Sequence, residues 1–241
     1  MKVAEKVILL LNGGDGFSAA IAGGLLPNPK SNFQTLNDSF ELPLECYGIK
    51  DRKVSGEITH FVNSNGHYEV SILHLQNYEP PILACALNEV LLKLAGEDLS
   101  TVPTIIAPFL VPESKIKLEN RYTEKSEKVL VYGIKLGPTT DVIQALSSRL
   151  QKSPPLLYIN HEGLATLRHL ANVMKLPTVM LIGLSGQRIS NKNSTEELEV
   201  ICQIGDHLAS ISALSFSKEK VVQNPPKISR ESKEAWRALY G

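Results

Sequence analysis

Cysteine and long apolar runs are scarce in this sequence, and each shortage excludes a class of protein. The three cysteines, Cys46, Cys85 and Cys202, are an odd number and too widely spaced for a C-x-x-C zinc or redox motif. We therefore expect buried free thiols in a reducing compartment. No apolar stretch approaches the ~20 residues that a membrane span requires, so we expect no membrane insertion.

Net charge is also absent. Lysine and arginine together number 25, and aspartate and glutamate also number 25. A neutral chain has no overall field to attract nucleic acid or an anionic membrane, so we expect partners to be recognised locally, with neither of these among them. The first apolar run, 7–11, is shorter than the roughly seven residues of a secretory signal core. We expect a cytoplasmic protein, with the nucleus as an additional location.

What the sequence does contain is a regular alternation of short apolar runs and segments of helical periodicity. It predicts strands at 7–11, 102–107, 129–134, 155–159 and 178–184, and helices at 16–26, 81–94, 162–175 and 196–213. The runs 56–62 and 67–75 predict a hairpin, because Asn65-Gly66 supplies the positive φ angles of its turn. The charged stretch from Glu113 to Lys125 is interpreted as a solvated loop. We predict one layered α/β domain over residues 1–223, with a mixed central sheet flanked by helices.

After Pro225-Pro226 the chain becomes polar, and we predict a flexible C-terminal docking tail over residues 224–241. Its end is a hydrophobic residue, a tyrosine and a last residue with a carboxylate. Such an ending can fill an apolar slot, place the phenol at a polar rim and pair the carboxylate with a lysine. The candidate partner-binding residues are Trp236, Leu239, Tyr240 and Gly241. The alternative is that the same apolar side chains fold back on the domain as a small amphipathic helix.

A glycine-rich turn, Asn12-Gly13-Gly14-Asp15-Gly16, follows the first predicted strand and precedes a predicted helix. This placement could cradle phosphate on helix amides. The turn fits neither the G-x-G-x-x-G pattern nor the P-loop, since Gly16 is followed by Phe17 and Ser18. Two interpretations stay open: a structural turn, or a site at Gly13–Gly16 for a phosphorylated or nucleoside-like ligand of a small-molecule enzyme.

Signals of catalysis are weak elsewhere. The segment Gly183-Leu184-Ser185-Gly186-Gln187 lacks the fifth-place glycine of a nucleophile elbow. His161-Glu162 lacks the second histidine of a zinc-protease motif, because Ala165 stands in its place. No paired acidic motif suggests a glycosidase or a phosphotransferase. We therefore expect no catalytic residues, no cofactor, no metal and no enzyme activity.

Two stretches, Tyr158–Ala165 and Leu170–Leu181, resemble the proteasome assembly chaperone 1 family. In that family a strand, a helix starting near a His-acidic pair and a Lys-x-Pro step into the next strand follow in this order. The helix start at Thr195-Glu196 is also similar, so the resemblance covers roughly residues 155–215. The ending Leu239-Tyr240-Gly241 matches the family's hydrophobic-tyrosine-any docking tail. The Trp-Arg-x-Leu ending is similar to the partner family, proteasome assembly chaperone 2.

The resemblance implies a non-enzymatic chaperone that forms a heterodimer with a second, related proteasome assembly chaperone. It also implies that this pair promotes assembly of the ring of proteasome α-subunits, with the tail entering between neighbouring subunits. The chain departs from the family in starting almost directly at its first strand, without a long charged extension. Its turn at Asn12–Gly16 does not match the family either.

Overall fold

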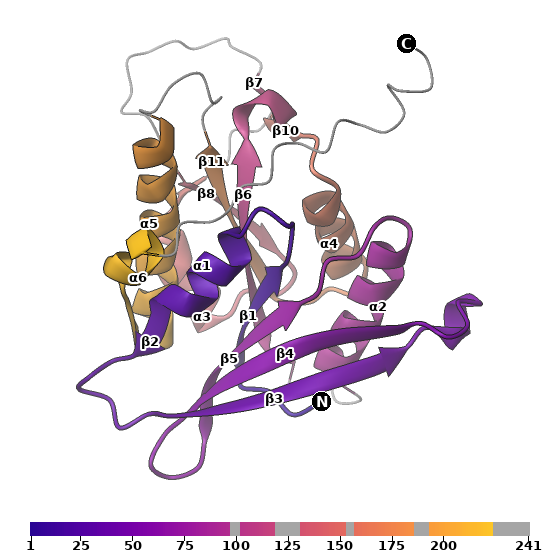
Figure 1. Ribbon diagram of the computed structural model, residues 1–241, viewed down its shortest axis with the longest axis horizontal. Coiled ribbons are helices and arrows are strands. Elements are labelled where there is room, and N and C mark those ends of the chain that lie inside the picture. Colours follow the sequence, from indigo (N-terminus) through magenta and orange to yellow (C-terminus); the bar gives the residue numbers. More distant parts are fainter. Residues whose placement is uncertain (97–101, 119–130, 153–156, 186–192, 224–241) are drawn as a thin grey trace.

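The computed structural model describes residues 1–96, 102–118, 131–152, 157–185 and 193–223. Within them an eight-stranded mixed sheet carries helices on both faces, which gives three layers (Figure 1). The predicted α/β class, with a mixed central sheet flanked by helices, is therefore confirmed. The predicted docking tail, 224–241, lies outside the described residues.

The strands of this sheet are β1 (Lys6–Leu11), β3 (Gln34–Pro43), β4 (Lys53–Val62), β5 (Tyr68–Leu75), β6 (Thr104–Pro112), β8 (Val131–Leu136), β9 (Gln151–Lys152) and β11 (Thr178–Ser185). Four short strands form two separate antiparallel pairs: β2 (Leu25–Pro27) with β12 (Leu214–Phe216), and β7 (Ile116–Leu118) with β10 (Leu157–Ile159). The α-helices are α1 (Phe17–Gly24), α2 (Ile82–Ala95), α3 (Asp141–Ser147), α4 (Glu162–Val173), α5 (Asn193–Ser212) and α6 (Lys218–Gln223). No helix in the described parts is long and apolar enough to cross a membrane.

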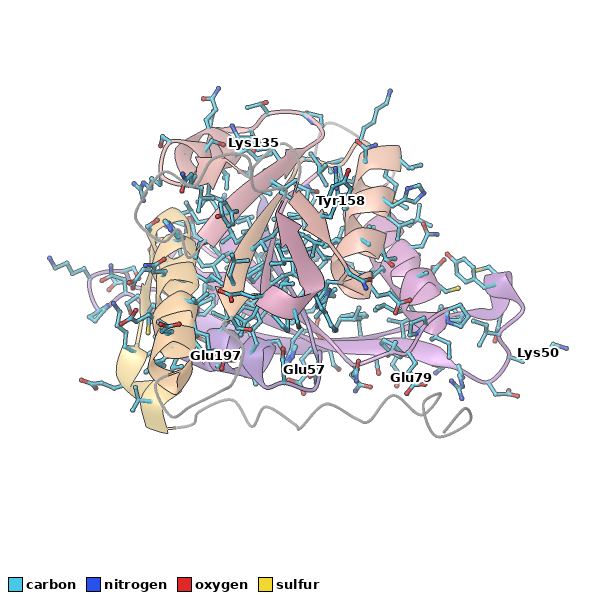
Figure 2. The ribbon with its side chains drawn as sticks, turned by 90° about the horizontal axis from the view of Figure 1, so that it is seen from above. Lys50, Glu57, Glu79, Lys135, Tyr158 and Glu197 are labelled. Atoms are coloured by element: carbon cyan, nitrogen blue, oxygen red, sulfur yellow. The ribbon has the colours of Figure 1, made fainter. Side chains whose placement is uncertain are left out.

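The sheet has the strand order β3-β4-β5-β1-β6-β11-β8-β9. Its centre, β5-β1-β6-β11, is parallel, while β3 and β4 are antiparallel at one edge and β8 is antiparallel to β11. Strands β3 and β4 are long and run toward α2, where Leu42 and Val54 join the core under this helix (Figure 1). Lys50, in the connection between the two strands, lies at the outer end of the molecule on this side (Figure 2).

Side chains of β1 alternate between two hydrophobic cores, one on each face of the sheet. Ile8 and Leu10 pack into the core under α1, α3, α5 and α6. Val7 and Leu9 pack into the core under α2 and α4. All four side chains are fully buried, as a strand in the parallel centre of such a sheet should be. The continuous apolar run at the start of the sequence therefore does form a strand that is buried on both faces.

The hairpin of β4 and β5 is also confirmed. The Asn63 amide donates to the His67 carbonyl over 2.9 Å, and Gly66 has a φ of 79°. The Asn63 side chain accepts from the amides of Asn65 and His67, so the turn satisfies its own backbone donors. The turn chemistry thus sets the register of the two strands.

Two expectations about local structure are wrong, one strand was not expected, and Cys46 is exposed rather than buried. The first helix ends at Gly24 and not at Leu26, because the next residues pair with β12 and the Gly24 carbonyl accepts from Ser217. The charged loop is partly ordered, as a 3-10 turn at Glu113–Lys115 and as β7, which gains a partner strand in β10. Strand β3 was not expected, because eight of its ten residues are exposed and it carries little apolar pattern.

Phe216 of β12 lies against two helices at positions where both have glycine. A Cβ atom added at Gly24 of α1 or at Gly205 of α5 would overlap its ring. The neighbouring Gly23 has no atom within 4 Å of such a Cβ. The two glycines at the ring therefore allow the close contact of β12 with both helices.

We expect Gly24→Ala to lower the free energy of unfolding by about 1–3 kcal/mol, because the added methyl group overpacks the contact with Phe216. The matched control is Gly23→Ala in the same helix, which should be neutral or stabilising by up to about 1 kcal/mol. Denaturant unfolding of both variants measures the difference. Equal stability of the two variants would contradict this account of the packing.

Candidate functional site

The carboxyl ends of β5, β1 and β6 meet at one edge of the sheet, since these strands are parallel. The chain leaves β1 for α1 on one face and leaves β5 for α2 on the other face. Ligands of open α/β sheets bind at such a topological switch point. This edge is therefore the place where a functional site is expected from the fold.

The glycine-rich turn lies at this edge and satisfies backbone donors with its own side chains. Asn12 Oδ1 accepts from the Gly14 amide, and Asp15 Oδ1 accepts from the Phe17 amide at the start of α1, each over 3.0 Å. Gly14 and Gly16 have φ angles of 74° and 77°, in the left-handed region that favours glycine. The predicted turn is present, and the Asp15 carboxylate takes the place that an anion would occupy at the start of α1.

His161 begins the helix on the opposite face. Its Nδ1 atom accepts from the Leu164 amide over 3.2 Å, so the ring is the N-cap of α4. A neutral ring that accepts at Nδ1 carries its proton on Nε2. The ring of Phe109, from β6, meets it edge-on with 5.6 Å between the centroids. The imidazole at the start of α4 is therefore held by a hydrogen bond from the Leu164 amide and by the Phe109 ring.

Lys115 is the third residue at this edge, beside Asp15 and His161. It lies in the 3-10 turn after β6, and its carbonyl accepts from the Asn160 amide over 2.7 Å, next to His161. Burial lowers the pKa of His161, the Lys115 ammonium lowers this pKa further, and the Asp15 carboxylate raises it. Three elements thus bring a carboxylate and an ammonium within electrostatic reach of the imidazole.

This arrangement favours a structural role for Asp15 and His161. His161 is the N-cap of α4, and Asp15 accepts from the first amide of α1, whose N-cap is Gly16. The carboxylate at the start of α1 repels a phosphate group, which weakens the interpretation of the Gly13–Gly16 turn as a phosphate cradle. The remaining free function of the imidazole is a hydrogen-bond donor at Nε2.

The candidate residues Trp236, Leu239, Tyr240 and Gly241 lie outside the described residues. Sequence reasoning tested His161 only as a zinc ligand and missed it as a helix cap. The signal that could have found it is a polar residue directly before Glu162 and an amphipathic run. In the described parts of the chain, no group of three or more His, Cys, Asp or Glu could hold a metal ion.

The lowered pKa of His161 makes stability depend on pH with a definite sign. The unfolded chain binds a proton near pH 6.5 while the folded chain resists it, so stability is lost as the pH falls through this value. We expect His161→Asn, which keeps a capping side chain, to lose less free energy of unfolding than the native chain between about pH 7.5 and pH 5. The control His169→Asn, on the exposed face of α4, should behave like the native chain. Identical pH profiles for H161N and the native chain would overturn this account.

Comparison with solved structures places this fold among known ones. PbaB from Pyrococcus furiosus, an archaeal proteasome activator, matches with a TM-score of 0.53 and 12% identity over 100% of this chain and 96% of its own. A PAC2 family protein from Streptomyces avermitilis matches with a TM-score of 0.50 and 12% identity over 98% and 94%. A proteasome-assembly chaperone homologue from Mycobacterium tuberculosis matches with a TM-score of 0.50 and 11% identity over 97% and 93%.

These likenesses show that the chain shares the fold of these three proteins, one of which is described as a proteasome-assembly chaperone homologue. This is the coarser part of the resemblance found in the sequence. No curated protein matches the sequence. One family model matches all residues, 1–241. The chain therefore belongs to the family described as a domain of unknown function, DUF7894.

Proposed function

We propose that this protein is a proteasome assembly chaperone that acts by binding other proteins. The observation that carries the proposal is the likeness of fold, over the whole chain, to an archaeal proteasome activator and to a proteasome-assembly chaperone homologue. Because one fold can serve many functions, a second and independent support is needed. The hydrophobic-tyrosine-any ending, Leu239-Tyr240-Gly241, supplies it.

The proposed working form is a heterodimer with a second, related proteasome assembly chaperone. The chain has no net charge, so its affinity for a partner must come mainly from shape and from buried apolar surface. The pair would promote assembly of the α-ring of the proteasome core particle. The carboxyl edge agrees with a binding role, because the side chains of Asp15 and His161 already accept from backbone amides there.

The tail is the proposed docking element for the α-ring. Leu239 would fill an apolar slot, Tyr240 would pack its ring and hydrogen-bond through its hydroxyl, and the Gly241 carboxylate would pair with a lysine. Trp236 would add an aromatic contact four residues before Tyr240. Three terminal groups that act together would make the tail specific for α-subunits.

Purification of the protein with an N-terminal tag, which leaves Gly241 free, tests the partners. Mass spectrometry of the co-purified proteins should find a related α/β chain in about equal amount, together with proteasome α-subunits. The same tag on an unrelated neutral protein is the control. A stable monomer that recruits no related chain from its own cell extract would contradict the heterodimer.

Deletion of 239–241 tests the docking tail. Loss of buried anchor residues costs a few kcal/mol, so we expect α-ring binding to weaken about a hundredfold. The fold and the pairing with the second chaperone should remain intact. Extension of the chain beyond Gly241 should cause much of the same loss, because it displaces the carboxylate.

Tyr240→Phe serves as the matched variant in this series, since it removes only the hydroxyl group and should weaken binding less than the deletion does. All proteins are compared in α-ring pull-down assays at equal folded concentration. Equal recovery of the intact, truncated and extended proteins would show that the tail is not a docking element.

A further inference from the structure

Two polar side chains are buried in the apolar face of the sheet that α2 and α4 cover. His60 of β4 is 4% exposed and Ser71 of β5 is fully buried, and the two residues are directly opposed in the antiparallel pair. Val7 of β1 is the parallel partner of Ser71 on the other side and belongs to the core under α2 and α4. Buried polar groups need hydrogen-bond partners, so this pair requires an explanation.

The partner is the segment before β1, residues 1–5. The Ala4 amide donates to Ser71 Oγ over 2.9 Å, and the Glu5 carbonyl accepts from the Thr104 amide over 2.7 Å. Further out, Lys2 Nζ lies 4.5 Å from the centroid of the Tyr68 ring. The first residues of the chain therefore close this end of the sheet, and the Ser71 hydroxyl is the acceptor at their centre.

One arrangement of protons gives each hydrogen in this contact an acceptor. The Ser71 oxygen accepts from Ala4, and in this arrangement its single hydrogen is donated to His60 Nδ1, which lies 2.8 Å away. The neutral His60 ring must then accept at Nδ1 and carry its own proton on Nε2. A second proton on the ring turns Nδ1 into a donor. The Ser71 hydrogen then loses its acceptor although Ser71 is fully buried, and we expect the contact with Ala4 to weaken.

We propose that protonation of His60 unlocks the N-terminal segment, residues 1–5, from the sheet, so that this end of the sheet is closed at neutral pH and opens in mildly acidic solution. The segment is the part that can move, because the hydrogen bond from Ala4 to Ser71 depends on the proton on the neighbouring ring. Opening uncovers the buried polar pair and the Tyr68 ring. The inference is independent of the proposed chaperone function.

The groups around His60 support a ring that is neutral while the N-terminal segment is closed. Burial lowers the pKa of His60, the Lys2 ammonium on the closing segment also lowers it, and Asp38 on β3 raises it. The Tyr68 ring meets the imidazole edge-on, with 4.7 Å between the centroids. Release of the segment removes the Lys2 charge and lets water reach the ring, so the open form binds the proton more readily than the closed form.

Hydrogen exchange of the full chain tests the proposal at the Ala4 amide. After correction for intrinsic rates, protection of this amide should fall about tenfold between about pH 7.5 and pH 5.5. The amides of β6 and β11 report global unfolding, and their protection should fall less over the same pH range. His60→Gln, whose side-chain oxygen can accept from Ser71 without titrating, should show protection that does not change with pH. His67→Gln, at an exposed position in the β4–β5 turn, is the matched control and should keep the native response.

Three results would overturn the proposal. One is constant Ala4 protection in the native chain over this pH range. Another is a fall in Ala4 protection in His60→Gln that is as large as the fall in the native chain. The third comes from nitrogen NMR of the native chain, which needs no variant to fold: a neutral His60 ring protonated at Nδ1 would rule out the proton arrangement. A neutral His60 ring protonated at Nε2, together with a local fall in the protection of the Ala4 amide, supports the proposal.

Discussion

The fold depends on one constraint: the central parallel strands β1, β6 and β11 have apolar side chains on both faces, and both faces must be covered. Helices α1, α3, α5 and α6 cover one face, while α2 and α4 cover the other. The chain must therefore change sides between β1 and β5, and this crossing creates the switch point at the carboxyl edge. The placement of the turn at residues 12–16 and of the His161 cap follows from it.

The parts of the fold that could be predicted from the sequence are those governed by local chemistry. The apolar run of β1 and the Asn65-Gly66 turn identified a buried strand and a hairpin because a few neighbouring residues decide each of them. Strand β3 could not be found, because its order comes from pairing with β4 and not from its own polar sequence. The end of α1 was misplaced for the same reason, since β12, far away in the sequence, decides it.

The candidate site was predictable only in part. The turn at Gly13–Gly16 was visible in the sequence, but the meeting of Asp15, Lys115 and His161 depends on how β1, β7 and β10 are arranged in space. Spacing along the chain carries no information about such a meeting. The proposed docking residues are the reverse case. They act as a short linear motif, so the sequence could indicate them without any knowledge of the fold.

The contact of Phe216 with two glycines has a consequence for how this family can change over evolution. Positions 24, 205 and 216 share one volume, because a larger side chain at either glycine needs the space that the ring occupies. Substitution of any one of them alone is penalised, whereas a smaller residue at 216 would permit alanine at the other two. The three positions should therefore covary among related sequences, so that substitutions in α1, α5 and β12 occur together.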